Sequence, residues 1–364
     1  MTETTVIRNA GWVVAWDAAK TSHVYLRDAD VAFTGGDIVH VGPNYAGPAD
    51  VEIPGRDLMV MPGLVNIHSH PTSEPMNKGV TDEIHSPNFH HSSLYEYLPV
   101  LGNDAEGRGP CHRVAMAELL KSGCTTVVDY SVAFDGWLDL LAEAGIRACI
   151  APSFRDAPWY TKDGNVVEYD WSDPKRGPKG FETAKRLVDL AQQHPSGRLM
   201  GMMSPGQIDT CSAELLQKAH RHAEERNLPF QIHAAQSVVE FWEIVRRHGK
   251  TPIQWMDDIG ILTDRSIVGH CIFLDHHPWL HWTTRIDLDL MAERGATVAH
   301  CPTVFMRRGI ALNTFGGYLR HGVKMGIGTD TYPHNILDEI RNVGTVARAV
   351  AGTVADVSTS EIFH

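Results

Sequence analysis

The sequence lacks several features that mark particular classes of protein. No run approaches the roughly 18 to 20 apolar residues that a membrane-spanning helix needs. The first residues, MTETTVIRNAGW, include an acid and lack the charged-then-apolar layout of an export signal. Basic residues are also scarce, with 32 Lys plus Arg against 44 Asp plus Glu and a net charge of -12. Without a basic cluster, nucleic acid and anionic membranes are poor partners. We therefore expect a cytoplasmic protein whose partner is a small molecule.

Two further absences concern redox chemistry. The six cysteines are scattered without CxxC spacing, which favours reduced thiols over a disulfide framework. No GxGxxG follows an expected strand, so a nucleotide-dependent redox enzyme has no support. The composition is 43% hydrophobic and 21% charged, with 32 Gly and 20 Pro, which excludes collagen-like, disordered and coiled-coil proteins. Histidine stands out, with 21 copies.

The rhythm of the chain changes near residue 58. Residues 4–57 alternate short β-rich stretches with Gly, Asp and Asn turns, which is typical of a small antiparallel sheet. We therefore expect an N-terminal β module, sandwich-like in form, over residues 1–57. From residue 58, apolar runs of five to seven residues are each followed by a segment of helical length and period. The eight runs are 64–68, 125–130, 148–154, 199–205, 230–235, 266–271, 297–302 and 324–330.

Eight such βα units predict an α/β fold of the closed (β/α)8 TIM-barrel type over residues 58–364. The runs are apolar nearly throughout, as expected of parallel strands covered on both faces. The segment 71–104 shows little helical pattern, and a loop of that length in a compact domain is usually functional.

Polar residues at the ends of these runs are the first candidates for a site, because active sites of such barrels lie at the C-terminal ends of the strands. The first run ends in His68 and His70, whose side chains share a face because they are two residues apart. The fifth carries His233, the sixth His270 and the eighth Asp330. A single histidine there is usually a hydrogen-bonded structural residue. Several imidazoles and a carboxylate from different strands instead suggest N and O ligands for a divalent metal, with a position left for water.

The motifs around these residues resemble the amidohydrolase superfamily of metal-dependent hydrolases. They are MPGLVNIHSH, IHAAQS, VGHCIFLD, AHCP and GIGTDT, and with the β module the resemblance covers nearly the whole chain. The branch they look most like holds the cytosine, guanine and adenosine-type deaminases and the triazine hydrolases, with one metal per site. The resemblance implies that His68, His70, His233 and Asp330 bind the metal. It implies that His270 orients the water or the substrate carbonyl.

The number of metals can be argued from residues. A two-metal site of this superfamily needs a bridging modified lysine or acid on the third or fourth strand, and neither ACIAPSF nor LMGMMSP contains Lys, Asp or Glu. We expect one divalent ion, Zn²⁺ first, with Fe²⁺, Co²⁺ or Mn²⁺ accepted by the same ligands. Such an ion makes hydroxide available at neutral pH. Asp330 can then carry a proton to the leaving nitrogen, and His270 can stabilise the developing oxyanion.

Two departures from the family pattern concern the substrate. Gln236 stands where the deaminases usually have a proton-shuttling Glu, and an amide has no proton to exchange at neutral pH. After the seventh strand, HCPTVFMRRG brings Arg307, which could clamp a substrate anion or simply lie on an acidic surface. We also expect Tyr130, Arg155 and His300, near other strand ends, to line the substrate pocket beside Gln236 and Arg307.

These observations favour a metal-dependent hydrolase that cleaves a C–N bond of a small amide, urea or carbamate-like molecule. The alternative is a deaminase or chlorohydrolase acting on a nitrogen heterocycle, and a non-catalytic metal-binding relative comes third. Family members usually continue with strands that complete the β module, and these strands have no counterpart after SEIFH. Either the sequence is a truncated form, or the missing strands come from elsewhere, or the module is small and leaves an exposed sheet edge. An exposed edge would need protection, so we expect a homo-oligomer.

Overall fold

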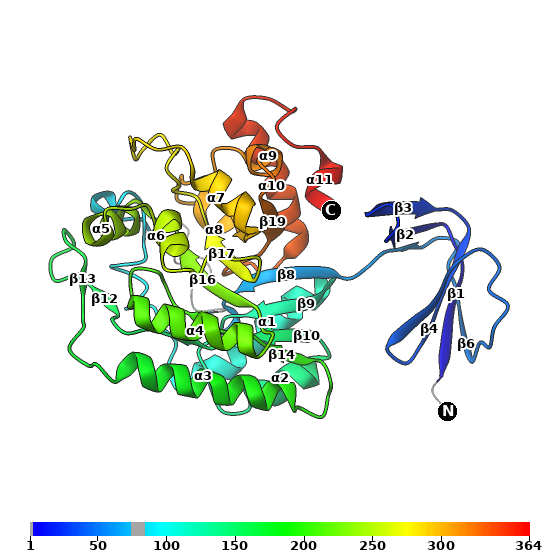
Figure 1. Cartoon of the computed structure of the whole chain (residues 1–364). Helices are drawn as coiled ribbons and strands as arrows, with labels where there is room; N and C mark the ends of the chain where they lie inside the picture. The colour runs from blue at the N-terminus through cyan, green and yellow to red at the C-terminus, as the bar shows by residue number, and fades with distance from the viewer. Residues whose placement is uncertain (1–2, 74–83) are drawn as a thin grey trace. The chain divides into compact units, whose positions relative to one another are not determined.

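The structure is a computed structural model that describes residues 3–73 and 84–364 (Figure 1). The chain forms two compact units. Residues up to Gly63, together with Phe363 and His364, make the first unit, and Leu64–Ile362 make the second.

The first unit contains two small sheets. One has the strand order β5-β4-β1-β6 and the other β3-β2-β7, and neighbouring strands are antiparallel except for β1/β6 and β2/β7. The buried core is formed by Ala10, Val13, Ala29 and Val31. The boundary predicted after residue 57 precedes β7, which pairs with β2. The strands are β1 (Thr4–Ala10), β2 (Trp12–Asp17), β3 (Ser22–Leu26), β4 (Ala29–Thr34), β5 (Asp37–Gly42), β6 (Val51–Pro54) and β7 (Met59–Val60).

All eight predicted runs in the second unit contain strands, and the predicted (β/α)8 fold is confirmed. The strands are β8 (Leu64–Ser69), β9 (Cys124–Asp129), β10 (Arg147–Ile150), β14 (Leu199–Gly201), β16 (Phe230–Ala234), β17 (Ser266–His270), β18 (Thr297–His300) and β19 (Lys324–Ile327). Short additional pairs, β11 (Ser153–Phe154) with β15 (Ser204–Pro205) and β12 (Trp159–Tyr160) with β13 (Glu168–Tyr169), lie in the connections.

Single bridges link the two four-stranded parallel sheets into a ring. The sheets have the orders β14-β10-β9-β8 and β16-β17-β18-β19. Met203 bridges to Phe230 on one side, and Ser69 bridges to Asp330 on the other. The first and last strands of the barrel are therefore neighbours, which places residues far apart in the sequence at one rim.

Helices alternate with the strands and cover the outside of the barrel (Figure 1). Several begin at side-chain caps, for example Ser212, Ser237 and Thr251, whose hydroxyls accept a backbone N–H three residues ahead. The helices are α1 (Ala105–Lys121), α2 (Trp137–Ala144), α3 (Arg176–Gln192), α4 (Ala213–Glu225), α5 (Val238–His248), α6 (Pro252–Asp258), α7 (Asp287–Arg294), α8 (Pro302–Met306), α9 (Phe315–Arg320), α10 (Ile336–Ala351) and α11 (Thr359–Phe363), with 3₁₀ turns η1 (Pro71–Ser73) and η2 (Pro87–Phe89).

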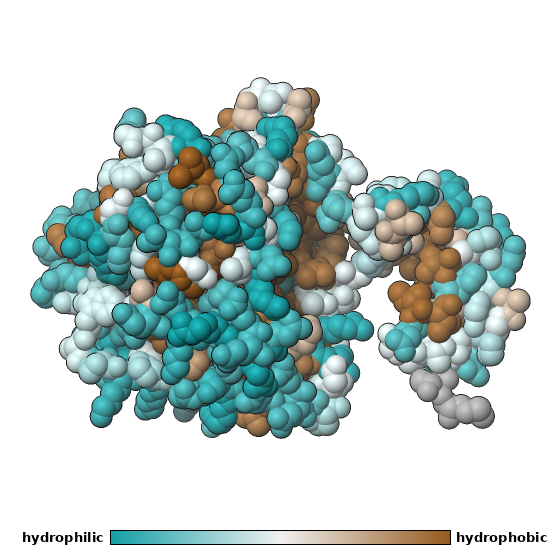
Figure 2. All heavy atoms as spheres, viewed as in Figure 1, coloured by the Kyte–Doolittle hydropathy of each residue, from teal (hydrophilic) through white to brown (hydrophobic). Residues whose placement is uncertain are grey.

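The face of the second unit seen in Figure 2 is largely hydrophilic. Among the described helices, none combines the length and apolarity that crossing a bilayer requires. Part of the predicted loop 71–104 lies outside the described residues; of the rest, Phe89 and Tyr95 pack with Trp159, and the Tyr95 hydroxyl lies 2.7 Å from Ser237 Oγ.

Candidate active site

Five residues singled out in the sequence meet at the C-terminal rim of the barrel. His68 lies near the end of β8 and His70 directly follows that strand. His233 lies in β16, His270 ends β17, and Asp330 follows β19. Parallel strands bring these ends together, as the pattern predicts.

Their nitrogen and oxygen atoms lie within reach of a single ion. Ligand atoms of His68, His233, His270 and Asp330 all lie within 4.8 Å of one another. His70 joins the same group, because its Nε2 is 3.3 Å from His233 Nε2 and 3.2 Å from Asp330 Oδ1. We call these five residues the metal cluster.

Three of the four imidazoles are oriented through Nδ1. His68 Nδ1 lies 3.3 Å from Gln231 Oε1, His70 Nδ1 lies 3.1 Å from the Tyr130 carbonyl, and His233 Nδ1 lies 2.7 Å from the Gly206 carbonyl. An oxygen acceptor at Nδ1 holds the proton there and leaves the Nε2 lone pair free for a metal, which is the usual arrangement of metal-binding histidine.

The protonation states suit a cation. Burial lowers the pKa of His68 and, with the neighbouring imidazoles, lowers that of His233 well below its usual value. Burial likewise lowers the pKa of His270 to about 3. Burial alone would raise the pKa of Asp330, but the facing His270, His68 and His70 bring it well below its ordinary value. Neutral imidazoles around an ionised carboxylate are the forms that bind a metal.

An unpartnered atom at the centre supports this interpretation. His68 is fully buried, and its Nε2 has no hydrogen-bond partner among the described residues, although Asp330 Oδ1 lies 3.3 Å away. A buried polar atom without a partner costs free energy unless something binds it. The residues therefore fit a bound divalent ion.

The predicted substrate-binding residues differ in their surroundings. Gln236 is buried in the loop between β16 and α5. The ring of Tyr130 contacts His68, His70 and His233, with centroids 5.0 to 5.5 Å apart, while its hydroxyl donates to the Pro205 carbonyl at 2.8 Å. Only the ring of Tyr130 thus faces the cluster.

Arg155 and Arg307 show a useful contrast. Burial lowers the pKa of Arg155, which lies over the ring of Trp159 and has no carboxylate partner among the described residues. Arg307 is held in place, since it donates to Thr331 Oγ1 at 2.9 Å and the Tyr332 carbonyl at 3.2 Å and stacks on the Tyr332 ring. Of the two, Arg155 is better suited to meet an anionic group.

His300 ends β18 and is buried. Burial lowers its pKa to about 4, and its ring packs on Phe315. Its Nδ1 has no hydrogen-bond partner among residues 3–73 and 84–364.

Sequence reasoning missed the residues that support the ligands. Gln231 was not singled out, although it lies two residues before His233 and so on the same face of β16, a signal that strand periodicity offers. A second buried group, His112 with Asp129 at 2.7 Å and Trp137 Nε1 donating to the same carboxylate at 2.7 Å, lies behind the end of β9. The Asp129 carboxylate therefore serves to hold His112 and Trp137 in place.

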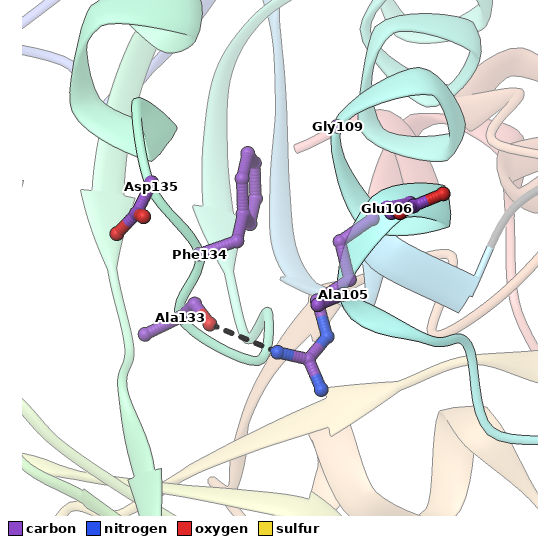
Figure 3. A pocket seen from close by; sticks show the side chains of 7 residues that line it. Ala105, Glu106, Gly109, Ala133, Phe134 and Asp135 are labelled. Carbon is purple, nitrogen blue, oxygen red and sulfur yellow. Dashed lines mark hydrogen bonds between the residues drawn. The ribbon is translucent and has the colours of Figure 1, made fainter.

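A separate hollow of about 380 Å³ lies between the start of α1 and the loop before α2 (Figure 3). In it, Arg108 donates to the Ala133 carbonyl at 3.3 Å. No member of the metal cluster lines this hollow. Its lining residues are Ala105, Glu106, Arg108, Gly109, Ala133, Phe134 and Asp135.

The fold and the cluster together define a class. A (β/α)8 barrel whose C-terminal rim joins imidazoles and a carboxylate around one point is the architecture of a metal-binding barrel hydrolase. The chain belongs to the amidohydrolase family, whose model matches residues 59–363.

Relatives and solved structures agree with this assignment. A 5-methylthioadenosine/S-adenosylhomocysteine deaminase of Thermococcus onnurineus is 28% identical over 339 residues, covering 91% of this chain and 73% of the relative. An adenosine deaminase of Xanthomonas campestris with bound zinc superimposes with a TM-score of 0.78 at 23% identity, covering 98% of this chain and 77% of that one. Atrazine chlorohydrolase of Arthrobacter aurescens with zinc gives a TM-score of 0.73 at 23% identity, covering 94% and 76%. The protein is thus a hydrolase of the amidohydrolase type, which acts on carbon–nitrogen bonds of small molecules.

Proposed function

We propose that this protein binds one divalent metal ion, Zn²⁺ in the first place, and uses it to hydrolyse a C–N bond of a small amide, urea or carbamate-like molecule. The observation that carries the proposal is the mutual approach, within 4.8 Å, of buried ligand atoms from His68, His233, His270 and Asp330. His68, His70, His233 and Asp330 would hold the ion. When bound, such an ion lowers the pKa of a water molecule toward neutrality and polarises a carbonyl.

The expectation of a single ion rests on the neighbouring strands. Neither β10 (Arg147–Ile150) nor β14 (Leu199–Gly201) carries a lysine, aspartate or glutamate that could bridge two ions. The adenosine deaminase of Xanthomonas campestris and the atrazine chlorohydrolase of Arthrobacter aurescens both contain zinc, which makes Zn²⁺ the first choice. Fe²⁺, Co²⁺ and Mn²⁺ accept the same ligands.

Asp330 and His270 are the proposed catalytic residues. Asp330 is ionised and 3.9 Å from His270 Nε2, so its carboxylate can take a proton from the attacking water and pass it to the leaving nitrogen. The buried imidazole of His270 can donate a hydrogen bond to oxygen charge that develops on the substrate.

The pocket above the cluster would be lined by Gln236, His300, Arg155, Tyr130 and Arg307. The guanidinium of Arg155, which has no carboxylate partner among the described residues, favours a substrate with an anionic or carbonyl-rich group. Gln236 can donate and accept hydrogen bonds but cannot exchange a proton with a ring nitrogen at neutral pH.

A second candidate is deamination of an adenine-type ring. It is favoured by the relatives, several of which are named deaminases of adenosine derivatives. Gln236 weighs against it, because the neutral amide offers no acid for ring protonation.

Substrate assays separate the two candidates. The Zn²⁺-loaded protein would be tested against amides, ureas, carbamates, adenosine and 5'-deoxyadenosine, with ammonia and amine or alcohol products measured separately. Gln236→Glu should raise release of ammonia from the adenosine compounds if ring deamination is the native reaction. Gln193→Glu, an equal charge change on an exposed helix end, is the control. Absence of activity on every C–N substrate in the metal-loaded protein would contradict both candidates.

The assembly can be examined on the same preparation. Ile38, Val39 and Met59 of the first unit are exposed, and apolar side chains gather on its visible face (Figure 2). These side chains support the expectation of a homo-oligomer, because large exposed apolar patches usually mark interaction sites. Light scattering coupled to size-exclusion chromatography tests it, and a monomeric mass would contradict it. The cytoplasmic location stays a prediction.

A further inference from the structure

Four polar side chains form a buried network beside the metal cluster. They are Asn66 and Ser69 of β8, Thr329 after β19, and His334 before α10. None is more than 1% exposed. We call them the polar network. None of the four is among the metal, catalytic or substrate-binding residues predicted in the sequence analysis.

The hydrogen bonds of Asn66 have a defined direction. Asn66 Nδ2–H donates to Thr329 Oγ1 at 2.8 Å, and Asn66 Oδ1 accepts from the backbone N–H of both Thr329 and His68 at 3.2 Å. The Thr329 hydroxyl, whose proton is not used in these bonds, lies 2.9 Å from His334 Nδ1. Ser69 Oγ lies 3.3 Å from the same nitrogen.

His334 also joins the network to the helical shell. Its backbone N–H donates to Glu118 Oε2 of α1 at 3.1 Å, and the N-cap of α10, Asn335, follows it. The imidazole is therefore fixed between α1, β8 and the loop after β19.

Two members of the network are adjacent in sequence to a metal-cluster residue. Ser69 lies between His68 and His70, and Thr329 precedes Asp330. Asp330 has a φ of 59°, a left-handed conformation that is uncommon outside glycine, although Asp tolerates it better than most residues. Its backbone N–H donates to the His68 carbonyl at 2.9 Å, and its carbonyl accepts the His70 N–H at 2.6 Å.

We propose that the polar network is a positioning device, in which Thr329 and His334 hold the backbone of Asp330 in register with His68 and His70. The inference rests on the proposed function, because it presumes that these residues bind the metal. Groups that orient ligands in this way usually change metal affinity by about 10- to 100-fold when removed. A role limited to packing would lower the stability of the whole barrel and leave metal affinity unchanged.

The test uses Thr329→Val, which keeps the shape but removes the hydroxyl, and Thr329→Ser, which keeps the hydroxyl. A matched control is Thr263→Val, because Thr263 Oγ1 forms a similar bond, 3.0 Å from Nε2 of the buried His220, away from the metal cluster. The full-length proteins are stripped with a chelator and titrated with Zn²⁺ against a coloured chelator. The melting temperature of each metal-free protein and the visible spectrum of its Co²⁺ form are also recorded.

We expect Thr329→Val to weaken Zn²⁺ binding about 10- to 100-fold and to change the Co²⁺ spectrum. Thr329→Ser should stay within about threefold of the wild type, and Thr263→Val should affect the melting temperature alone. Equal Zn²⁺ affinity of Thr329→Val and the wild type would overturn the proposal. Should Thr329→Val not fold, His334→Phe removes the same acceptor while keeping a ring, and the same criterion applies. A wild-type protein that binds no metal would instead refute the proposed function.

Discussion

The histidines at the barrel mouth are held in two different ways. At the ends of β8 and β16, which are not neighbours in the ring, His68, His70 and His233 each have an oxygen within 3.3 Å of Nδ1. At the ends of the adjacent strands β17 and β18, Nδ1 of His270 and His300 has no hydrogen-bond partner among the described residues. Those rings are held by packing on Phe305 and Phe315.

This difference separates two tasks. An imidazole whose Nδ1 is anchored has one tautomer and one orientation, which suits a permanent metal ligand. An imidazole held by aromatic packing alone can take either tautomer, which suits a group that must exchange hydrogen bonds with water or substrate during a reaction. We therefore expect the anchored histidines to bind the metal and the histidines held by aromatic packing to take part in the chemistry, with Asp330 contributing to both.

The largest loss of activity should come from replacing Asp330, which contributes both to metal binding and to catalysis in the proposed mechanism. Asp330→Asn keeps the volume but removes the charge and the proton acceptor, so we expect kcat/KM on the best C–N substrate to fall about 10⁴-fold. Steady-state kinetics at saturating Zn²⁺ would measure the loss. A variant that retains more than a tenth of the activity would remove Asp330 from the proposed mechanism.

His270→Asn should impair catalysis without releasing the metal. We expect kcat to fall about 10²- to 10³-fold while bound metal, measured by atomic emission, stays near the wild-type level. His233→Asn serves as the counterpart, because loss of an anchored ligand should release the metal as well. If both variants lose metal equally, the proposed division between metal-binding and catalytic histidines is wrong.

Gln231→Leu should sharpen the comparison by removing one anchor. It deprives His68 Nδ1 of its acceptor and the Ile67 carbonyl of a donor, so we expect Zn²⁺ affinity to fall about 10-fold. Gln217→Leu, which removes a similar amide bond to the Ile259 carbonyl outside the site, is the control. Competition with a chelator would measure both affinities, and equal values would show that the anchor is dispensable.

His277 offers the smallest effect, from a buried histidine outside the site. Its Nδ1 accepts a hydrogen bond from the N–H of Trp279 at 3.2 Å, whereas Nδ1 of the anchored histidines faces an oxygen acceptor. Burial, and to a smaller extent the nearby His276, lowers the pKa of His277 to about 4. Between pH 6.5 and 4 the unfolded chain binds more protons there than the folded one, so the free energy of unfolding falls as the pH decreases through this range.

Replacing this ring should remove that dependence. When the pH is lowered from 6.5 to 4, we expect the free energy of unfolding to fall by about 1 to 2 kcal/mol less in His277→Phe than in the wild type. Urea unfolding at both pH values would measure the difference. Identical losses in the two proteins would show that His277 does not titrate in this range.

The sequence predicted the barrel and the meeting of its ligands because both follow from periodic patterns. Apolar runs of strand length identified all eight strands, and parallel pairing alone brings residues such as His68 and Asp330 to one rim. The extra pairs β11/β15 and β12/β13 were not anticipated, because two-residue strands leave no periodicity to detect.

The support of the site was harder to predict. The carbonyl of Gly206 that anchors His233 is a backbone group, so no residue type announces it. The contact between Asn66 and Thr329 joins residues 263 positions apart, and only the closed ring brings them together. Gln231 is the exception, since its position two residues before His233 places it on the same face.

The bridge between Ser69 and Asp330 also bears on how the protein matures. Proposed ligands from the first and last barrel strands lie at this seam, so a growing polypeptide on the ribosome would hold an incomplete set until residue 330 has emerged. Residues His68, His70, His233 and Asp330 would bind a metal only in the finished site, so metal binding would favour the closed ring over opened forms.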